Sequence, residues 1–142
     1  MVLYEGRLSR FDGSRFVTYA IVDTNSPPGT ENIYETRDGV YWISTTRSTY
    51  RFDPSRTSQP ESDPPRLNAQ FVTNSRGMSL QDRNGVLWLA STSLFRLADI
   101  DGKQAFVPVP LDIQARSNAT FTAFELAEAS DGVHYGFKAV WV

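Results

Sequence analysis

Two stretches of the chain are apolar at nearly every position. They are VYWIST at residues 40–45 and VLWLAS at residues 86–91. Both are rich in β-branched and aromatic residues. Each directly follows a turn-forming pair, Asp38-Gly39 or Asn84-Gly85. A strand that is apolar on both sides is typical of a sheet covered on both faces. No stretch has a convincing helical stripe. The nearest one, residues 121–129, precedes another Asp-Gly pair, so we expect a strand there too.

Asp-Gly or Asn-Gly pairs divide the chain at regular places. They stand at residues 12–13, 38–39, 84–85, 101–102 and 131–132. Such pairs favour type I′ hairpin turns, in which both central residues have positive φ. The pairs at 38, 84 and 131 precede a strand with Trp or Tyr, whereas those at 12 and 101 follow a strand with an Arg-Phe-like pair. In a four-stranded meander A-B-C-D these are the A–B and C–D turns, which emerge on one face.

The pattern recurs at a nearly fixed period. Gly39 and Gly85 are 46 residues apart, and Gly85 and Gly132 are 47 apart. Periods of about 40–50 residues indicate a repeat architecture and are typical of propeller blades. We expect the recurring tryptophans to pack between blades, and the recurring arginines, which include Arg10, to bind nearby carbonyls or carboxylates. The recurring residues of the predicted repeats are Gly39, Trp42, Arg51, Gly85, Trp88, Arg96 and Gly132.

The chain is therefore predicted to be an all-β, partial β-propeller over residues 1–142, built of four-stranded antiparallel meanders. Residues 32–73 and 78–109 are interpreted as two full blades. Residues 1–20 are interpreted as strands C and D of an earlier blade, and residues 121–142 as strands A and B of a later one. Because propellers close with roughly four to eight blades, further blades in cis or in trans, as in an oligomer, are needed for a ring.

Three segments carry a resemblance to a known repeat. They are GRLSRFDGSRFVTY at 6–19, DGVYWISTTRSTYRFDP at 38–54 and NGVLWLASTSLFRL at 84–97. The pattern Asp-x-x-Gly-x-x-Trp, followed by Thr or Ser and an Arg-Phe-Asp-like strand, resembles the two-component regulator propeller repeat. The resemblance implies a ligand-sensing segment of an extracytoplasmic, periplasmic sensor region, in which histidine kinase activity resides in a separate domain. This chain departs from the family's large receptors in its small number of blades.

Composition narrows the function classes. A length of 142 residues with 40% hydrophobic residues suits one domain with a core. The net charge of −2 gives no attraction to nucleic acid or to an anionic membrane. The sequence has no cysteine, no apolar run long enough to span a membrane, and no signal-like N-terminal segment. We therefore expect no nucleic-acid partner and no membrane contact by this segment.

Candidate catalytic and metal-binding residues are scarce. His134 is the only histidine, and a structural or surface role is expected for it. The DIDG segment at 99–102 resembles a calcium loop, but Leu97 and Pro108 occupy its first and last ligand positions. We predict no catalytic residue, no metal and no cofactor. A propeller-fold glycan hydrolase or lyase and a purely structural repeat fragment stay open as alternative functions.

The non-repeating loops are the expected binding surface, because loops on a rigid scaffold carry binding residues disproportionately. We predict a small polar ligand, carbohydrate or anionic, bound by amide, hydroxyl and guanidinium groups of one face. The candidate residues are Asn25, Thr30, Arg47, Asn74, Arg76, Arg116 and Asn118. The Pro-rich stretch at 53–66 is interpreted as a solvated, semi-rigid insertion, with a docking strip for a partner as the alternative.

Overall fold

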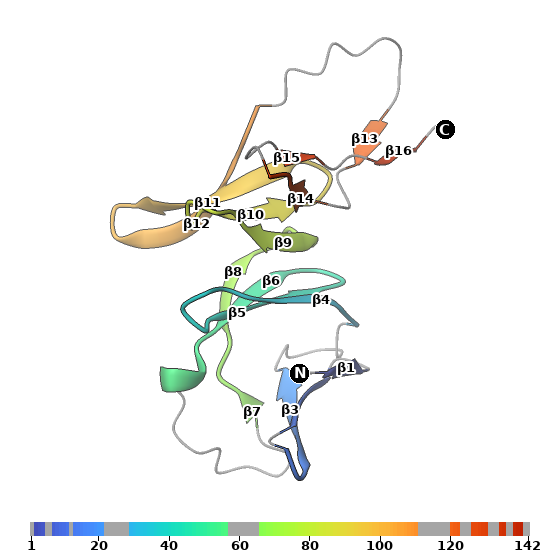
Figure 1. Cartoon of the computed structure of the whole chain (residues 1–142), viewed down its shortest axis with the longest axis vertical. Helices are drawn as coiled ribbons and strands as arrows, with labels where there is room; N and C mark the ends of the chain where they lie inside the picture. The colour runs from blue at the N-terminus through green and yellow to red at the C-terminus, as the bar shows by residue number, and fades with distance from the viewer. Residues whose placement is uncertain are drawn as a thin grey trace.

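The computed structural model describes residues 2–4, 7–11, 13–21, 29–56, 66–110, 120–122, 126–130, 134–135 and 138–140. Within this part of the chain the structure consists of β-strands, one 3-10 turn, η1 (Pro54–Arg56), and no α-helix. Three four-stranded sheets follow one another along the long axis of the molecule (Figure 1). The prediction of an all-β chain with four-stranded antiparallel sheets is confirmed for the second and third of them.

The second and third sheets are simple meanders. The second has strand order β4 (Thr30–Glu35), β5 (Tyr41–Thr45), β6 (Thr49–Phe52) and β8 (Gln70–Thr73), all antiparallel. The third has order β9 (Met78–Gln81), β10 (Leu87–Ala90), β11 (Leu94–Ile100) and β12 (Lys103–Pro108), also antiparallel. These sheets span residues 30–73 and 78–108, within two residues of the ranges expected for two repeats.

The first sheet differs from the expected pair of strands over residues 1–20. Its order is β1 (Val2–Tyr4), β2 (Arg7–Phe11), β3 (Phe16–Ile21) and β7 (Arg66–Leu67). The apolar segment Val-Leu-Tyr adds a strand at one edge, paired antiparallel with β2. At the other edge β7, which begins at the last residue of the Pro-rich stretch, pairs parallel with β3. The end of that stretch is therefore part of a sheet, while its residues 57–65 lie outside the described part.

The C-terminal region forms two short antiparallel pairs. One joins β14 (Ala127–Glu128) to β15 (His134–Tyr135), and the other joins β13 (Thr120–Thr122) to β16 (Lys138–Val140). The strand expected over residues 121–129 is thus two short strands, and residues 123–125 between them lie outside the described part. The β14–β15 pair brackets the Asp-Gly pair at residues 131–132. In the same way β4–β5 brackets residues 38–39 and β9–β10 brackets residues 84–85.

The turns at residues 38–39 and 84–85 are not of the predicted type I′. In the loop at 36–40, the amide of Thr36 donates to the Val40 carbonyl at 2.9 Å and the Gly39 amide donates to the Thr36 carbonyl at 2.8 Å. Only Gly39, with φ 78°, has a positive φ there, as in a type I turn followed by a left-handed residue. Type I′ needs a two-residue loop, which is present at Asp101-Gly102, where φ is 53° and 77°.

Buried side chains fill the spaces between adjacent sheets. Between the first and second sheets Leu8 packs with Ile43, Phe52 and Leu67. Between the second and third sheets the buried residues are Val40, Trp42 and Leu87. On the far face of the third sheet Ala90 and Leu94 pack with Leu126 of the C-terminal region. Both faces of the second and third sheets are therefore covered, which explains why their central strands are apolar throughout.

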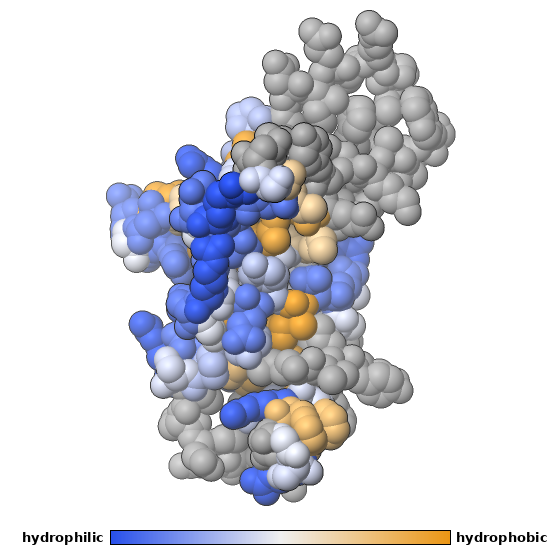
Figure 2. Space-filling model, viewed as in Figure 1, coloured by the Kyte–Doolittle hydropathy of each residue, from blue (hydrophilic) through white to orange (hydrophobic). Residues whose placement is uncertain are grey.

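Figure 2 shows a largely hydrophilic face interrupted by small, separate hydrophobic groups. The large exposed hydrophobic residues of the described part are Phe11, Phe16, Phe71 and Ile100. Phe11 and Phe16 contact each other at a ring-centroid distance of 4.8 Å. They pair across β2 and β3, and strand alternation places them on the face opposite Leu8, away from the second sheet.

Candidate functional site

The loops at 36–40 and 82–86 occupy equivalent places in the second and third sheets, and each is closed by its first side chain. The Thr36 hydroxyl donates to the Val40 carbonyl at 2.8 Å and also contacts Asp38 Oδ1 at 2.5 Å. In the third sheet Asp82 takes the place of Thr36. Its loop is closed by the same backbone bonds, since the Asp82 amide donates to the Val86 carbonyl at 2.9 Å.

Asp82 is a buried carboxylate whose oxygens accept several hydrogen bonds. Asp82 is 2% exposed. Its Oδ1 accepts from the amides of Asn84 and Val86, each at 2.9 Å, and its Oδ2 accepts from Trp88 Nε1 at 2.9 Å. A buried charge is tolerated when such bonds replace its lost hydration. The spacing Asp-x-x-Gly-x-x-Trp thus has a physical cause, since one carboxylate holds both the turn and the indole.

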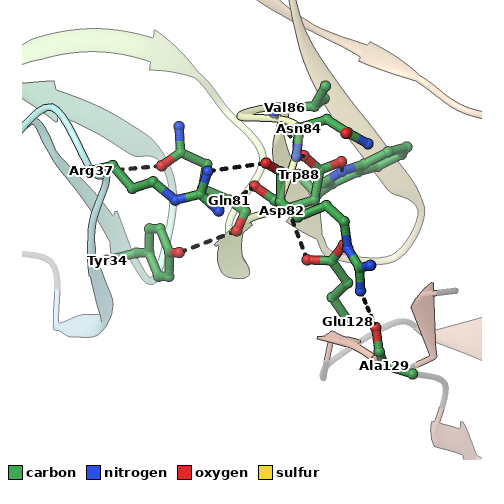
Figure 3. Close-up of polar contacts among 10 residues, drawn as sticks. Tyr34, Arg37, Gln81, Asp82, Asn84, Val86, Trp88, Glu128 and Ala129 are labelled. Atoms are coloured by element: carbon green, nitrogen blue, oxygen red, sulfur yellow. Dashed lines mark hydrogen bonds and ion pairs between the residues drawn. The ribbon is translucent and has the colours of Figure 1, made fainter. Parts of the chain in front are cut away.

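Arg37 joins the second sheet to the third (Figure 3). Its backbone amide donates to Gln81 Oε1 at 2.9 Å. Its guanidinium donates to the carbonyls of Asp82 at 2.9 Å and Arg83 at 3.1 Å. The forked guanidinium can reach two successive carbonyls because it presents several N–H groups in one plane.

Arg83 makes the corresponding contacts to the C-terminal region. Its amide donates to Glu128 Oε2 at 2.8 Å, and its Nε donates to Glu128 Oε1 at 2.7 Å. Its Nη2 donates to the Ala129 carbonyl at 2.6 Å. We name the contacts of Arg37 and of Arg83 the first and second arginine clasps. In each, an arginine directly before the Asp- or Asn-Gly pair binds residues at the end of strand A in the following sheet.

Sequence reasoning missed both clasps, although a signal for them exists. Arg37 and Arg83 are 46 residues apart, the same period as the glycines, and stand in the similar segments TRDGV and DRNGV. Their acceptors, Gln81 and Glu128, also lie three residues before an Asn- or Asp-Gly pair. The third repeat has Ser130 at the arginine position. The arginines of the Arg-Phe-like strands form a clearer pattern because they occur three times, whereas the clasp arginines occur twice.

A cleft of about 320 Å³ lies beside the first clasp, between the second and third sheets. Its apolar wall includes Val40, Trp42, Leu87 and Leu97. Trp42 is 3% exposed and meets the Phe106 ring edge-on, at a centroid distance of 5.5 Å and an interplanar angle of 73°. The polar lining residues are Thr36, Asp38, Arg51, Gln81, Asn84 and Gln104. The cleft is of the size at which small-molecule sites begin.

Arg51 also borders a smaller cleft of about 180 Å³, together with Asp53, Arg56, Asn68 and Gln70. Arg51 Nη2 lies 3.4 Å from Asp53 Oδ2, and Arg56 Nε lies 3.2 Å from the same oxygen. The hydroxyl of Ser55 donates to Asp53 Oδ1 at 2.6 Å. This hydrogen bond, reinforced by the Ser55 amide and the two guanidinium groups, holds the pKa of Asp53 below its usual value. Arg51 is thus held by a carboxylate of its own strand end.

The remaining recurring residues take these places. Gly39 and Gly85 have φ values of 78° and 85° in the two loops. Trp88 is half-buried beside Leu126, with its indole held by Asp82. Arg96 is exposed and pairs with Trp88 across β10 and β11, as Arg51 pairs with Trp42 across β5 and β6. Gly132 lies outside the described residues.

The four described candidates of the loop face lie together, at the end of the second sheet opposite the clasps. Thr30 pairs with Thr45 at the start of β4, and the amide of Thr46, beside exposed Arg47, donates to the Gly29 carbonyl at 2.8 Å. Asn74 is exposed at the end of β8. Arg76 Nη1 binds Glu31 Oε1 at 2.8 Å, which sequence reasoning did not predict. Asn25, Arg116 and Asn118 lie outside the described residues.

Buried polar atoms without a hydrogen-bond partner gather near this end. Within the described residues they are Thr30 Oγ1, Asn32 Oδ1 and Ser79 Oγ. Asn32 shares a face of the second sheet with Ser44, its partner on β5, and Ser79 lies on β9, which contacts β4. Such groups need water or another partner in solution.

Tyr41 lies where the first and second sheets meet. Burial, a hydrogen bond from its phenol to the Glu35 carboxylate, and the negative charge of Glu35 raise the pKa of Tyr41, against a smaller opposing effect of Arg10. Arg10 of β2 therefore lies near Tyr41 of the next sheet. Glu35 is the residue of the second sheet that corresponds to the clasp acceptors Gln81 and Glu128.

The described residues contain no group of three or more His, Cys, Asp or Glu side chains that could hold a metal ion. Among the same residues there is no helix long and apolar enough to cross a membrane. Comparison of the chain with models of known families, with curated proteins and with solved structures found no match.

Proposed function

We propose that this chain is a segment of a ligand-sensing β-propeller and that it binds a small polar ligand without chemically changing it. The observation that carries the proposal is the recurrence of one junction. Arg37 and Arg83 join successive sheets through the same backbone and guanidinium positions, and the first junction borders a polar cleft. Sheets added at a constant step by a constant contact are how a propeller is built.

A sensor function is supported by this geometry together with the resemblance to the two-component regulator propeller repeat. On this proposal the segment lies in an extracytoplasmic sensor region and its output domain is separate. A hydrolase or lyase is less well supported, because glycoside hydrolysis ordinarily needs two carboxyl groups across the scissile bond. Asp38 is the single carboxylate among the residues that line the larger described cleft.

Further sheets, in cis or in trans, are part of the same proposal. Phe11 and Phe16 lie on the side of the first sheet away from the second and are 52% and 60% exposed. A preceding sheet of the same repeat would cover this face, as the first sheet covers Ile43 on the second. We expect light scattering of residues 1–142 to find either a symmetric oligomer or a chain that is unstable without further repeats. A stable monomer of 142 residues that unfolds cooperatively would contradict this part of the proposal.

Calorimetry on a protein that carries residues 1–142 tests the binding function. The panel comprises neutral sugars, sugar acids, amino acids and a DNA duplex. We expect saturable binding of a sugar or a sugar acid at micromolar to millimolar strength, no binding of DNA, and recovery of the ligand unchanged by chromatography. Turnover of the ligand would favour the enzyme alternative. Failure of the whole panel to bind would favour a purely structural segment.

A further inference from the structure

We propose that the ligand site is the cleft between the second and third sheets beside the first arginine clasp, and that its ligand is a neutral, hydroxyl-rich molecule of sugar type. This inference rests on the proposed ligand-binding function and makes it specific. It places the ligand at the end of the sheets opposite to the loop residues chosen from the sequence. Asn84 and Val86, labelled beside the clasp in Figure 3, belong to this cleft.

Several polar groups in the cleft are already engaged in hydrogen bonds within the protein. The Thr36 hydroxyl bonds to Val40, the Gln81 side chain bonds to the Arg37 and Gly85 backbones, and Arg51 pairs with Asp53. In contrast, the side-chain amides of Asn84 and Gln104 and the Oδ2 of Asp38 make no hydrogen bond within the described structure. The groups without any hydrogen bond are therefore one carboxylate oxygen and two carboxamides, while Arg51 uses one of its five N–H donors on Asp53.

The groups without a hydrogen bond favour a ligand that is rich in hydroxyl groups. Each carboxamide offers two N–H donors and one acceptor, and the carboxylate oxygen accepts strongly. Adjacent hydroxyl groups of a sugar both donate and accept, so they match this set. An anion matches it poorly, because the uncommitted charge is the negative one of Asp38 while the guanidinium of Arg51 is paired with Asp53 at 3.4 Å.

The cleft also has an apolar wall whose residues are held in place by packing. Val40, Trp42 and Leu97 line the cleft, and such a wall suits the C–H face of a sugar ring. Trp42 is fixed against Phe106, and Arg37 ties the two sheets together beside the opening. The walls are thus positioned before a ligand arrives, which lowers the entropy cost of binding.

The opposite end of the sheets is less suited to the same ligand. Its Arg76 is paired with Glu31 at 2.8 Å, so one of its expected ligand groups is already engaged. It is nevertheless the main competitor, because Asn74 and Arg47 are exposed there. The two ends can be distinguished by variants that change one amide at a time.

The test is a titration followed by NMR on the ¹⁵N-labelled protein. The probes are D-glucose, D-galactose and N-acetyl-D-glucosamine, with D-galacturonate as the anionic counterpart. We expect a neutral sugar to shift the side-chain amide signals of Asn84 and Gln104. We expect Gln104→Ala to weaken its affinity about 5- to 10-fold, since one or two hydrogen bonds are lost. Lys103→Ala, an exposed neighbour outside the cleft, and Asn74→Ala at the opposite end are expected to leave the affinity unchanged.

Asp38→Asn separates the two ligand classes, because it keeps the shape of the side chain and removes its charge. A neutral sugar that donates to the carboxylate should bind more weakly, whereas an anion should bind more tightly. A preference of the unaltered protein for galacturonate over the neutral sugars, with galacturonate binding more tightly still in this variant, overturns the ligand class. Binding that is lost in Asn74→Ala and kept in Gln104→Ala overturns the cleft but leaves the proposed function standing. Absence of binding by every probe overturns both.

Discussion

Arg37 and Arg83 make the same contact one repeat apart. Each donates its backbone amide to the side chain of the residue that ends strand A in the next sheet, Gln81 or Glu128. Each also sends its guanidinium to the carbonyl of the residue that follows, Asp82 or Ala129. The second clasp differs because its acceptor is charged, so it adds an ion pair of 2.7 Å.

Replacing Arg37 by Ala should lower the free energy of unfolding by about 1–2 kcal/mol, because two carbonyl contacts between sheets are lost at a partly exposed site. Arg37→Lys should restore only part of the loss, since an ammonium cannot reach both carbonyls in the same fork. Urea titration measures the change. Arg47→Ala is the matched control, an exposed arginine in a loop of the same sheet. Equal effects of the two alanine variants would contradict a structural role for the clasp.

Asp82 and Trp88 should be energetically coupled. Asp82→Ala removes the acceptor of three hydrogen bonds and is expected to cost about 2–4 kcal/mol of stability. Trp88→Phe removes one of the donors, and a double-mutant cycle should give a coupling energy of about 1–2 kcal/mol. Thr36→Val is the control at the equivalent loop position, where the side chain only donates, and should cost about 1 kcal/mol. Additive effects of Asp82→Ala and Trp88→Phe would show that the indole bond contributes little.

The raised pKa of Tyr41 predicts that the protein loses stability at high pH. Its folded-state pKa is raised, so the folded protein favours the neutral phenol. This contribution is fully present below the unfolded pKa of about 10 and is lost as the pH rises from there through the folded pKa. Urea titrations across this alkaline range should show a decline that Tyr41→Phe reduces. Glu35→Gln should also reduce it, because it removes the negative charge that opposes ionisation. An unchanged alkaline decline in both variants would assign it to other groups.

The repeat and its period could be predicted from the sequence because they depend on local chemistry. The apolar runs around Trp42 and Trp88 are central strands covered on both faces, and the glycines at 39 and 85 are left-handed turn residues. The turn type at residues 38–39 and 84–85 was predicted wrongly because it depends on loop length, which the Thr36 and Asp82 backbone bonds determine. The β3–β7 pairing could not be predicted, because it joins residues that are separated in the chain by three strands of the second sheet.

The cleft was also outside the reach of sequence reasoning. It depends on which side chains remain uncommitted after the two sheets have packed, and Gln104 and Asp38 belong to different repeats. Arg51 was predicted to bind a nearby carbonyl or carboxylate of the protein, and Arg76 was predicted to bind the ligand. The structure pairs them with Asp53 and Glu31. Asp53 belongs to the Arg-Phe-Asp pattern that residues 10–12 share, whereas Glu31 stands at no recurring position.

Gly77 is required by a close backbone approach at the start of the third sheet. A Cβ atom built on Gly77 would lie 1.8 Å from the Ala90 carbonyl oxygen, which belongs to the central strand β10 and cannot move freely. Gly77→Ala should therefore force the backbone apart and cost about 2–4 kcal/mol of stability. Gly13→Ala is the matched control, because its φ of 101° is unfavourable for Ala but no atom lies within 4 Å of the added Cβ. It should cost about 1 kcal/mol. Thermal unfolding of both variants measures the difference, and a Gly77→Ala variant as stable as Gly13→Ala would show that the strand β9 can shift away from β10 without loss.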